Sequence, residues 1–325
     1  NAMPSIDTQL AAEFSYPLDL VRCTSCSLVQ ITCEVSGEIL FPTTYPYLSG
    51  STKILARNFE DLAKESCETL GLDSASLVMD IGSNDGTLLS KFKDAGVRVL
   101  GIEPTDAYKV AVKNGIDSVN EFFSEQLAGK LVKEFGRPKL VTAANVFAHI
   151  ADVNSIVRGI KALIGDDGVF VSESHYLGSI IDELQYDTIY HEHLRYYSLA
   201  SISHLLSAHG LKVFKAVHIP SHGGSIRVYA SASDAFDLDQ SVTDILTEER
   251  KLGLIDGRRD AEFKNRVIRS KHQLLKMLSS IKIEGKDIVG IGAPSRASTL
   301  MNFTGIDETF LDAVMEISSS KKIGF

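Results

Sequence analysis

The segment Asp187–Leu199, DTIYHEHLRYYSL, concentrates side chains that can exchange protons or donate hydrogen bonds. These side chains are Tyr190, His191, Glu192, His193, Tyr196 and Tyr197. Histidine titrates near neutral pH and can accept a proton in a catalytic step, while a tyrosine hydroxyl can donate to a developing oxyanion. The segment therefore predicts a proton-abstraction cluster. The alternative is a polar helix start whose tyrosines pack on a sheet. Within the segment, we expect His191 to face away from His193. We expect Tyr196 and Tyr197 to serve in packing.

The segments around this cluster alternate between short apolar runs and amphipathic stretches. A helix is predicted from Lys53, with one apolar face made of Ile54, Leu55, Phe59 and Leu62. Strands are predicted at Leu77–Ile81, Arg98–Ile102, Leu140–Val146 and Val169–Ser172. Such runs are typical of a parallel sheet that helices cover on both faces. Residues 174–198 interrupt this rhythm, and a helix over Leu199–His209 and two further strands, within 210–219 and 224–231, follow.

Composition and charge narrow the classes of function. The 325 residues are 44% hydrophobic and 23% charged, which is enough apolar material for more than one core. The net charge of −9 argues against nucleic acid or an anionic membrane surface as a partner, because both attract basic faces. No apolar run approaches membrane-spanning length and the start carries no secretory core, so we expect a cytoplasmic protein. The four cysteines form no dense disulfide framework.

A glycine loop in LVMDIGSNDGTLLSKF, residues 77–92, joins a predicted strand to a predicted helix. Gly82 allows a tight turn and a close ligand approach, and the helix start offers free N–H groups. The spacing is neither G-x-G-x-x-G nor a P-loop. Glu103 follows at the end of the next strand, where it can accept hydrogen bonds from ribose hydroxyls. Because Asp80 and Asp85 flank the loop, a cation-bearing nucleoside such as S-adenosylmethionine suits it better than a pyrophosphate. A strand-turn-helix without a ligand is the alternative.

The last part of the chain predicts a second, smaller α/β unit. Beyond Ser233 the sequence is polar and helical through Ser280. The stretch KDIVGIGAPSRASTLMNF then predicts a strand, a glycine turn and a helix, and Glu316 ends another predicted strand. Dinucleotide binding at this second glycine loop is therefore an alternative function.

Several motifs together resemble one enzyme family. DIGSNDGTLL, GIEPT, AANVFAHI, YHEH, PSHGGSIRVY and GAPSRASTLMNF occur in the order and approximate spacing of the S-adenosylmethionine-dependent deoxysugar C-methyltransferases that act on nucleotide-linked keto sugars. The resemblance covers nearly the whole chain. It implies an α/β fold with a seven-stranded Rossmann-like methyltransferase sheet whose last strand is antiparallel. It also implies a small zinc-bearing N-terminal domain and a second Rossmann-like domain at the C-terminus.

The resemblance also assigns roles to individual residues. The base is His193, and the assisting residues are Tyr190, Glu192 and His149. The cofactor motifs place Asp80, Gly82, Asn84, Asp85, Glu103, Pro104 and Asn145 at S-adenosylmethionine. Tyr45 and Tyr47, which lie in YPYLSGST, can cover the sulfonium with an aromatic face. Core packing is the alternative for both tyrosines.

The expected substrate contacts come from two later segments. In SHGGSIRVY, the residues His222, Gly223 and Gly224 can approach a sugar closely, and Arg227 can reach a phosphate. A plain glycine hairpin is the alternative there. In the second glycine loop, Ala293, Ser295 and Arg296 form a seat for a phosphate at a helix start.

The N-terminal segment departs from the family pattern. The family uses two Cys-x-x-Cys pairs for zinc, whereas this sequence has only Cys23 and Cys26 at that spacing, and Cys33 is spaced differently. We therefore expect no stoichiometric zinc and assign no metal ligand. The predicted domains are a truncated zinc-ribbon-like domain (1–52), the S-adenosylmethionine-binding domain (53–232) and a nucleotide-binding domain (233–325) that is incomplete at its end.

These observations favour a C-methyltransferase of a nucleotide-linked keto-deoxysugar, acting by enolisation and methyl transfer to carbon. An O- or N-methyltransferase of a small molecule would leave the cluster between Tyr190 and His193 largely unexplained. A non-catalytic sugar-nucleotide binding protein and an NAD oxidoreductase are further alternatives. The sequence does not specify the sugar, the methylated carbon, the nucleotide base or the oligomeric state.

Overall fold

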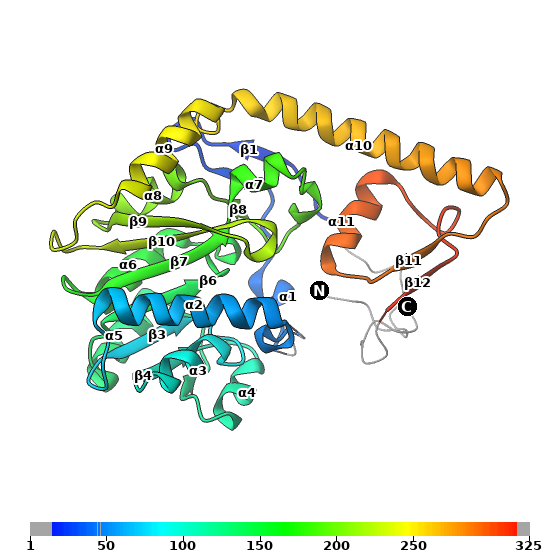
Figure 1. Ribbon diagram of the computed structural model, residues 1–325. Helices are drawn as coiled ribbons and strands as arrows, with labels where there is room; N and C mark the ends of the chain where they lie inside the picture. The colour runs from blue at the N-terminus through cyan, green and yellow to red at the C-terminus, as the bar shows by residue number, and fades with distance from the viewer. Residues whose placement is uncertain (1–14, 44, 46, 317–325) are drawn as a thin grey trace.

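The computed structural model describes residues 15–43, 45 and 47–316, and its centre is a seven-stranded sheet (Figure 1). In order across the sheet, the strands are β5 (Ser118–Val119), β4 (Arg98–Ile102), β3 (Leu77–Ile81), β6 (Leu140–Ala144), β7 (Val169–His175), β10 (Ser225–Ser231) and β9 (Lys212–Ile219). Strand β10 is antiparallel to both of its neighbours, while β3 to β7 pair in parallel. The predicted α/β fold with a seven-stranded Rossmann-like sheet is confirmed.

Helices cover both faces of this sheet. One face carries α2 (Lys53–Leu70), α3 (Thr87–Asp94) and α4 (Ala107–Lys113), and the other carries α5 (Glu125–Phe135), α6 (Val153–Ile164) and α8 (Leu199–Ser207). Successive strand residues point to opposite faces, so Val78 packs with the first helix group, and Met79 packs with the second. Both residues are fully buried. The continuous apolar runs of these strands follow from burial on both faces.

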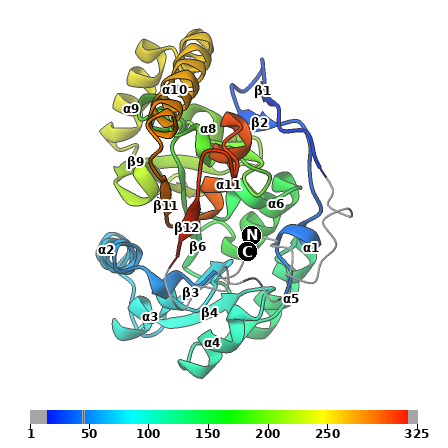
Figure 2. The same ribbon diagram turned by 90° about the vertical axis from the view of Figure 1, so that its right-hand side faces the viewer.

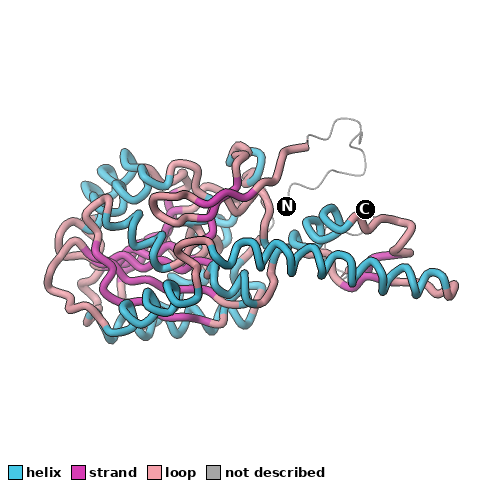
Figure 3. The backbone as a smooth tube through the Cα atoms, turned by 90° about the horizontal axis from the view of Figure 1, so that it is seen from above, coloured by secondary structure: helices cyan, strands magenta, loops and turns pink. Residues whose placement is uncertain are grey.

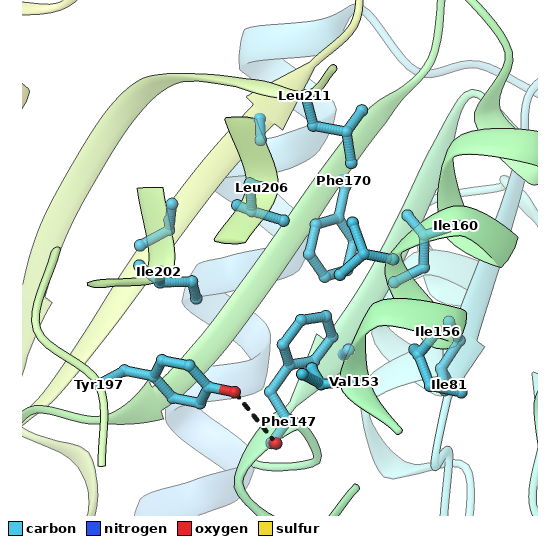
Figure 4. Close-up of a cluster of buried hydrophobic side chains, with 14 of the residues drawn as sticks. Ile81, Phe147, Val153, Ile156, Ile160, Phe170, Tyr197, Ile202, Leu206 and Leu211 are labelled. Carbon is cyan, nitrogen blue, oxygen red and sulfur yellow. Dashed lines mark hydrogen bonds between the residues drawn. The ribbon is translucent and has the colours of Figure 1, made fainter. Parts of the chain in front are cut away.

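The second face holds a cluster of large side chains (Figure 4). Phe147 and Phe170 lie with ring centroids 5.3 Å apart, and the Tyr197 hydroxyl donates to the Phe147 carbonyl oxygen at 3.4 Å. Tyr196 and Tyr197 are 2% and 1% exposed, which confirms that they serve in packing. Since Tyr197 lies near the end of the predicted catalytic segment, this cluster anchors that end of the segment to the domain core.

The segment between β7 and α8 connects the sheet to the N-terminal residues. It contains α7 (Leu177–Asp182), the short 3-10 helix η4 (Tyr186–Thr188) and β8 (Arg195–Tyr196). Strand β8 completes a small antiparallel sheet with β1 (Leu20–Arg22) and β2 (Val29–Ile31). The remaining short elements before α8 are α1 (Gly37–Leu40), η2 (Ser49–Ser51) and η3 (Phe147–His149). The N-terminal hairpin is therefore part of the same body as the sheet.

A long helix leads to the C-terminal unit (Figures 1 and 3). After η5 (Ser221–Gly223) and β10, the chain forms α9 (Gln240–Leu252), α10 (Arg258–Ile283), β11 (Val289–Ile291), α11 (Ser295–Thr304) and β12 (Ala313–Met315). Strands β11 and β12 pair in parallel with α11 between them, as predicted for a second α/β unit. This unit lies to the right of the central sheet in Figure 1, and in Figure 2 it is in front of the sheet. No helix among the described residues is both long and apolar enough to cross a membrane.

Several predicted boundaries were wrong. The third predicted strand ends at Ala144, the fourth continues to His175, and the helix that begins at Leu199 ends at Ser207. Ile54 is 70% exposed and lies outside the buried face of α2. The predicted domain limits stay predictions, and residues 1–14, 44, 46 and 317–325 of those domains lie outside the described residues.

Candidate active site

A cavity of about 1480 Å³ lies at the carboxyl ends of the central strands. Its walls come from the N-terminal segment, the loops after β3, β4 and β6, the segment between β7 and β8, and the start of α11. Most of the residues predicted for catalysis and ligand binding line it: Tyr45, Tyr47, Gly82, Asn84, Glu103, Pro104, Asn145, His149, Tyr190, Glu192, His193, His222, Ser295 and Arg296. One chamber thus joins the predicted cofactor loop, the predicted cluster and the C-terminal unit.

The loop after β3 has the shape of a ligand cradle. Gly82 has φ +70°, and a Cβ atom there would lie 2.6 Å from a Val146 methyl carbon, so only glycine is compatible with the packing. The amides of Gly82 and Ser83 donate to the Ile102 carbonyl oxygen, which ties the loop to the next strand. Asn84 also adopts a positive φ of 51°. Gly82 and Asn84 both line the cavity, so this loop forms part of its wall.

Glu103 lies beside this loop with its carboxylate held in place. Its Oε2 accepts from the Asn84 amide at 2.9 Å, and its Oε1 accepts from the amide and hydroxyl of Thr105 at 2.8 and 2.6 Å. The side chain is buried, at 4% exposure. A carboxylate has about four acceptor positions, so it can still accept from a diol. This geometry suits the predicted contact with a ribose.

Two acidic residues of the loop lie behind the cavity wall rather than in it. Asp80 accepts from the Thr142 hydroxyl at 2.7 Å and is 4% exposed. Burial, opposed by the hydrogen bond from Thr142 and aided by the nearby charges of Glu103 and Glu173, raises the pKa of Asp80 to about 7. Asp85 accepts from the Thr87 hydroxyl at 2.6 Å. Both residues support the loop, and the structure does not place them at the cavity as the cofactor prediction did.

Residues 47–52 lie against the loop. Asn84 accepts from the Ser49 amide at 2.9 Å and donates to the Tyr47 carbonyl oxygen at 3.1 Å. Asp85 accepts from the Gly50 amide at 2.8 Å. The loop therefore holds the segment that carries both cavity-lining tyrosines.

Two histidines of the cavity have their tautomers set by backbone carbonyl groups. The Nδ1 atom of His193 is 3.0 Å from the Thr188 carbonyl oxygen, and that of His149 is 2.6 Å from the Glu192 carbonyl oxygen. A carbonyl oxygen only accepts, so Nδ1 must carry the proton in both rings, and Nε2 of each neutral ring is a base. Burial lowers the pKa of His193 well below its ordinary value, and the neighbouring His149 lowers it further. Burial likewise lowers the pKa of His149.

The other two members of the cluster are hydrogen-bonded close to these rings. The Tyr190 hydroxyl lies 3.3 Å from Nε2 of His193, and it donates because that nitrogen has a lone pair. Burial raises the pKa of Tyr190, so its hydroxyl stays protonated. The Tyr45 hydroxyl donates to Glu192 at 3.0 Å, which links the segment beside the loop to the cluster. The prediction that His191 faces away is confirmed, since its Nε2 meets the Pro17 carbonyl oxygen.

His175 was not predicted from the sequence, yet it lines the cavity. Its ring centroid is 6.1 Å from that of His193 and 6.1 Å from that of His222. Its Nε2 is hydrogen-bonded to the His222 carbonyl oxygen, and burial lowers the pKa of both residues, that of His222 to about 4. The β7–β10 register, which pairs His175 with Ser225, places the two histidines together. Among the described residues, no group of three or more metal-ligating side chains is arranged to hold a metal ion.

The residues predicted to contact the substrate divide into two groups. Arg296 lines the cavity and binds Asp187 through two hydrogen bonds of 2.7 and 3.0 Å. Arg227 is 3% exposed and does not line the cavity, because its guanidinium pairs with Glu173 and Glu65 at 2.7 Å each. The predicted phosphate contact of Arg227 is thus replaced by a buried ion-pair network.

Three small residues predicted at the substrate also lie outside the cavity lining. A Cβ atom on Gly223 would lie 2.8 Å from the Gln185 amide, and one on Gly224 would lie 2.3 Å from the Ser179 hydroxyl. The amide of Ala293 donates to Glu316 at 2.9 Å. The two glycines therefore permit close packing of η5 on the segment after β7, and Ala293 shapes the turn before α11.

The fold and the site define a class, a Rossmann-like methyltransferase with a ligand cradle at the carboxyl edge of its sheet. Comparisons with known proteins agree: a methyltransferase domain family matches residues 52–216, and a C-methyltransferase C-terminal domain family matches residues 220–325. The C-methyltransferase NovU of Streptomyces niveus is 32% identical over 296 residues, which cover 90% of this chain and 70% of that protein. The chain belongs to the C-methyltransferase family and is an S-adenosylmethionine-dependent enzyme.

Solved structures with similar folds are more distant. The 1,6-didemethyltoxoflavin-N1-methyltransferase of Burkholderia thailandensis, solved with S-adenosylhomocysteine, is 13% identical with a TM-score of 0.47, covering 65% of this chain and 97% of that one. The magnesium protoporphyrin IX methyltransferase of Synechocystis PCC 6803, solved with S-adenosylmethionine, is 13% identical with a TM-score of 0.42, covering 54% and 78%.

Proposed function

We propose that this C-methyltransferase acts on a nucleotide-linked keto-deoxysugar and that His193 removes the proton beside the ketone. The observation that carries the proposal is the position of Nε2 of His193, an unprotonated nitrogen in the cavity that the cofactor loop also lines. Methylation of a sugar carbon requires a carbon nucleophile, which forms when a base removes a proton next to a carbonyl group. An O- or N-methyltransferase needs no such cluster.

The cluster can divide the acid and base work. Nε2 of His193 accepts the proton, and the electron pair of the broken carbon–hydrogen bond moves onto the carbonyl oxygen as an enolate. The pKa of His193 is lowered by burial, so the ring is neutral and ready at pH 7. Tyr190 keeps its proton, and its hydroxyl, which donates to Nε2 of His193 in this structure, can turn to the enolate oxygen when substrate is bound. S-adenosylmethionine, when bound, supplies the electrophilic methyl group for the nucleophilic carbon.

Other residues of the cavity would hold the two ligands. Gly82 and Glu103 suit the cofactor, since both line the cavity and Glu103 can present carboxylate oxygens to a ribose. Glu192 is 4% exposed and can accept from a sugar hydroxyl. At the far end, Ser295 and Arg296 begin α11 and can meet the nucleotide phosphates. The cavity volume of about 1480 Å³, with both Glu103 and Arg296 in its lining, supports a large substrate beside the cofactor.

The proposal is tested with methyl-labelled S-adenosylmethionine and a panel of nucleotide-linked 4-keto and 3-keto deoxysugars. We expect one member of the panel to gain a methyl group, and carbon NMR of the product to place the label on a carbon next to the former ketone. A label on oxygen or nitrogen, or transfer only to substrates without a ketone, would refute the proposal.

A further inference from the structure

Among the described residues, the contacts between the C-terminal unit and the start of the catalytic segment include an ion pair and a ring contact. The Nε and Nη2 atoms of Arg296 donate to the two carboxylate oxygens of Asp187 at 3.0 and 2.7 Å. The rings of Tyr186 and Phe303 pack with centroids 5.4 Å apart. These contacts join α11 to η4, the turn that immediately precedes the cluster. The two-pronged geometry fixes the position of the carboxylate more firmly than a single contact would.

The same turn fixes the proposed base. Asp187 is followed by Thr188, whose carbonyl oxygen accepts from Nδ1 of His193 at 3.0 Å. This contact keeps the proton on Nδ1 and leaves Nε2 unprotonated, as a base that accepts from the Tyr190 hydroxyl. The Thr188 hydroxyl donates to the Gln185 carbonyl oxygen at 2.8 Å, so the turn is internally braced. The Tyr196 hydroxyl also donates to the Thr188 carbonyl oxygen at 3.4 Å, and Asp187 ties the same turn to α11.

We propose that Asp187 is a positioning residue that couples the C-terminal unit to the base, by holding the turn whose carbonyl group sets the tautomer and direction of His193. This proposal rests on the proposed role of His193 and extends it to a residue that touches neither substrate nor cofactor. Arg296 has five N–H donors and uses two of them on Asp187. The remaining donors can meet a nucleotide phosphate, so one arginine connects the nucleotide end of the cavity with the base.

The test compares Asp187→Asn, Arg296→Gln and the double variant. Asp260→Asn is the matched control, because Asp260 forms a similar two-pronged pair with Arg22 at 2.6 and 2.7 Å, away from the catalytic turn. Urea unfolding of all variants shows whether any loss reflects the fold. Two readouts are used: solvent-proton exchange at the substrate α-carbon at saturating nucleotide sugar, and ¹⁵N NMR of the His193 ring, assigned by its absence in His193→Asn.

We expect Asp187→Asn to slow exchange on the order of tenfold, since small misplacements of a catalytic group are costly. The ¹⁵N spectrum should change from the Nδ1–H form toward a mixture of tautomers. The double variant should be no slower than Arg296→Gln, because both changes break the same pair. Asp260→Asn should leave both readouts unchanged.

Parent-like exchange and an unchanged ring spectrum in Asp187→Asn would overturn the proposal. Weaker nucleotide binding by Arg296→Gln, with normal exchange at saturation, would also overturn it, because Arg296 would then be only a phosphate ligand. If the parent protein exchanges no proton from any keto sugar, the proposed function fails. The ring spectrum still tests the positioning role of Asp187 in that case, because it needs no substrate.

Discussion

The buried carboxyl group of Asp80 should make the stability of the methyltransferase domain depend on pH in an unusual direction. The pKa of Asp80 is raised from an ordinary 3.8 to about 7 in the folded protein. The folded state therefore holds a proton that the unfolded state loses above pH 4. The stabilising effect of this proton is fully present below pH 4 and is lost as the pH rises toward 7. Above about pH 7 the loss is complete.

The size of the effect follows from the shift. A change of about three pKa units, at about 1.4 kcal/mol per unit, gives roughly 4 kcal/mol as an upper value. Asp80→Asn has no proton to lose, and its side-chain oxygen can still accept from Thr142. Between pH 4.5 and pH 8 the parent protein should lose about 2–4 kcal/mol of unfolding free energy that Asp80→Asn does not lose. The variant should therefore gain stability relative to the parent as the pH rises.

Urea unfolding at pH 4.5, 6 and 8 measures this difference. Asp94→Asn, at an exposed position at the end of α3, is the control and should show a constant difference from the parent. The assignment of a neutral carboxyl group beneath the cofactor loop would be refuted by either of two results. The difference in unfolding free energy between Asp80→Asn and the parent protein could stay constant with pH, or it could shift in favour of the parent as the pH rises.

Three further predictions concern ligands and metal. Glu103→Ala should weaken S-adenosylmethionine binding by roughly 2–4 kcal/mol, because a carboxylate that holds a diol makes two charge-assisted hydrogen bonds; unchanged affinity by calorimetry would remove Glu103 from the site. Tyr45→Phe removes the donor to Glu192 and should cost about tenfold in turnover while sparing cofactor affinity; the reverse result would make Tyr45 a cofactor contact. Elemental analysis should find well under one zinc per chain, and a value near one would contradict the prediction drawn from the single pair Cys23 and Cys26.

The central strands were predictable because burial on both faces of the sheet requires a continuous apolar run in each strand. Strand β5 was missed, since its two residues, Ser118 and Val119, form an edge strand too short for a pattern. The helix from Lys53 was predicted from the spacing of its apolar residues. The exposure of Ile54 was not predicted, because it depends on which side of the helix faces the sheet. A period of 3.6 fixes the width of an apolar face only to about one residue.

The site was predictable where neighbours in sequence act together, as in the cluster around His193. It was not predictable where partners come from separate elements. The sequence predicts Arg227 as a phosphate ligand. In the fold it pairs instead with Glu173 on the neighbouring strand β7 and with Glu65 on α2. His175 ends a strand with no local motif, and only the pairing of β7 with β10 places it in the cavity.

Solvent-proton exchange at the α-carbon of the nucleotide-linked keto sugar tests the central claim most directly, because it reports enolisation without methyl transfer. The assay is run in deuterated buffer with S-adenosylhomocysteine as the bound cofactor product. The parent protein should exchange the proton, and His193→Asn should slow exchange by roughly 10²–10⁴-fold with S-adenosylmethionine affinity unchanged. His191→Asn, whose ring meets Pro17 instead of the cavity, should behave like the parent. Exchange at the parent rate in His193→Asn would show that His193 is not the base.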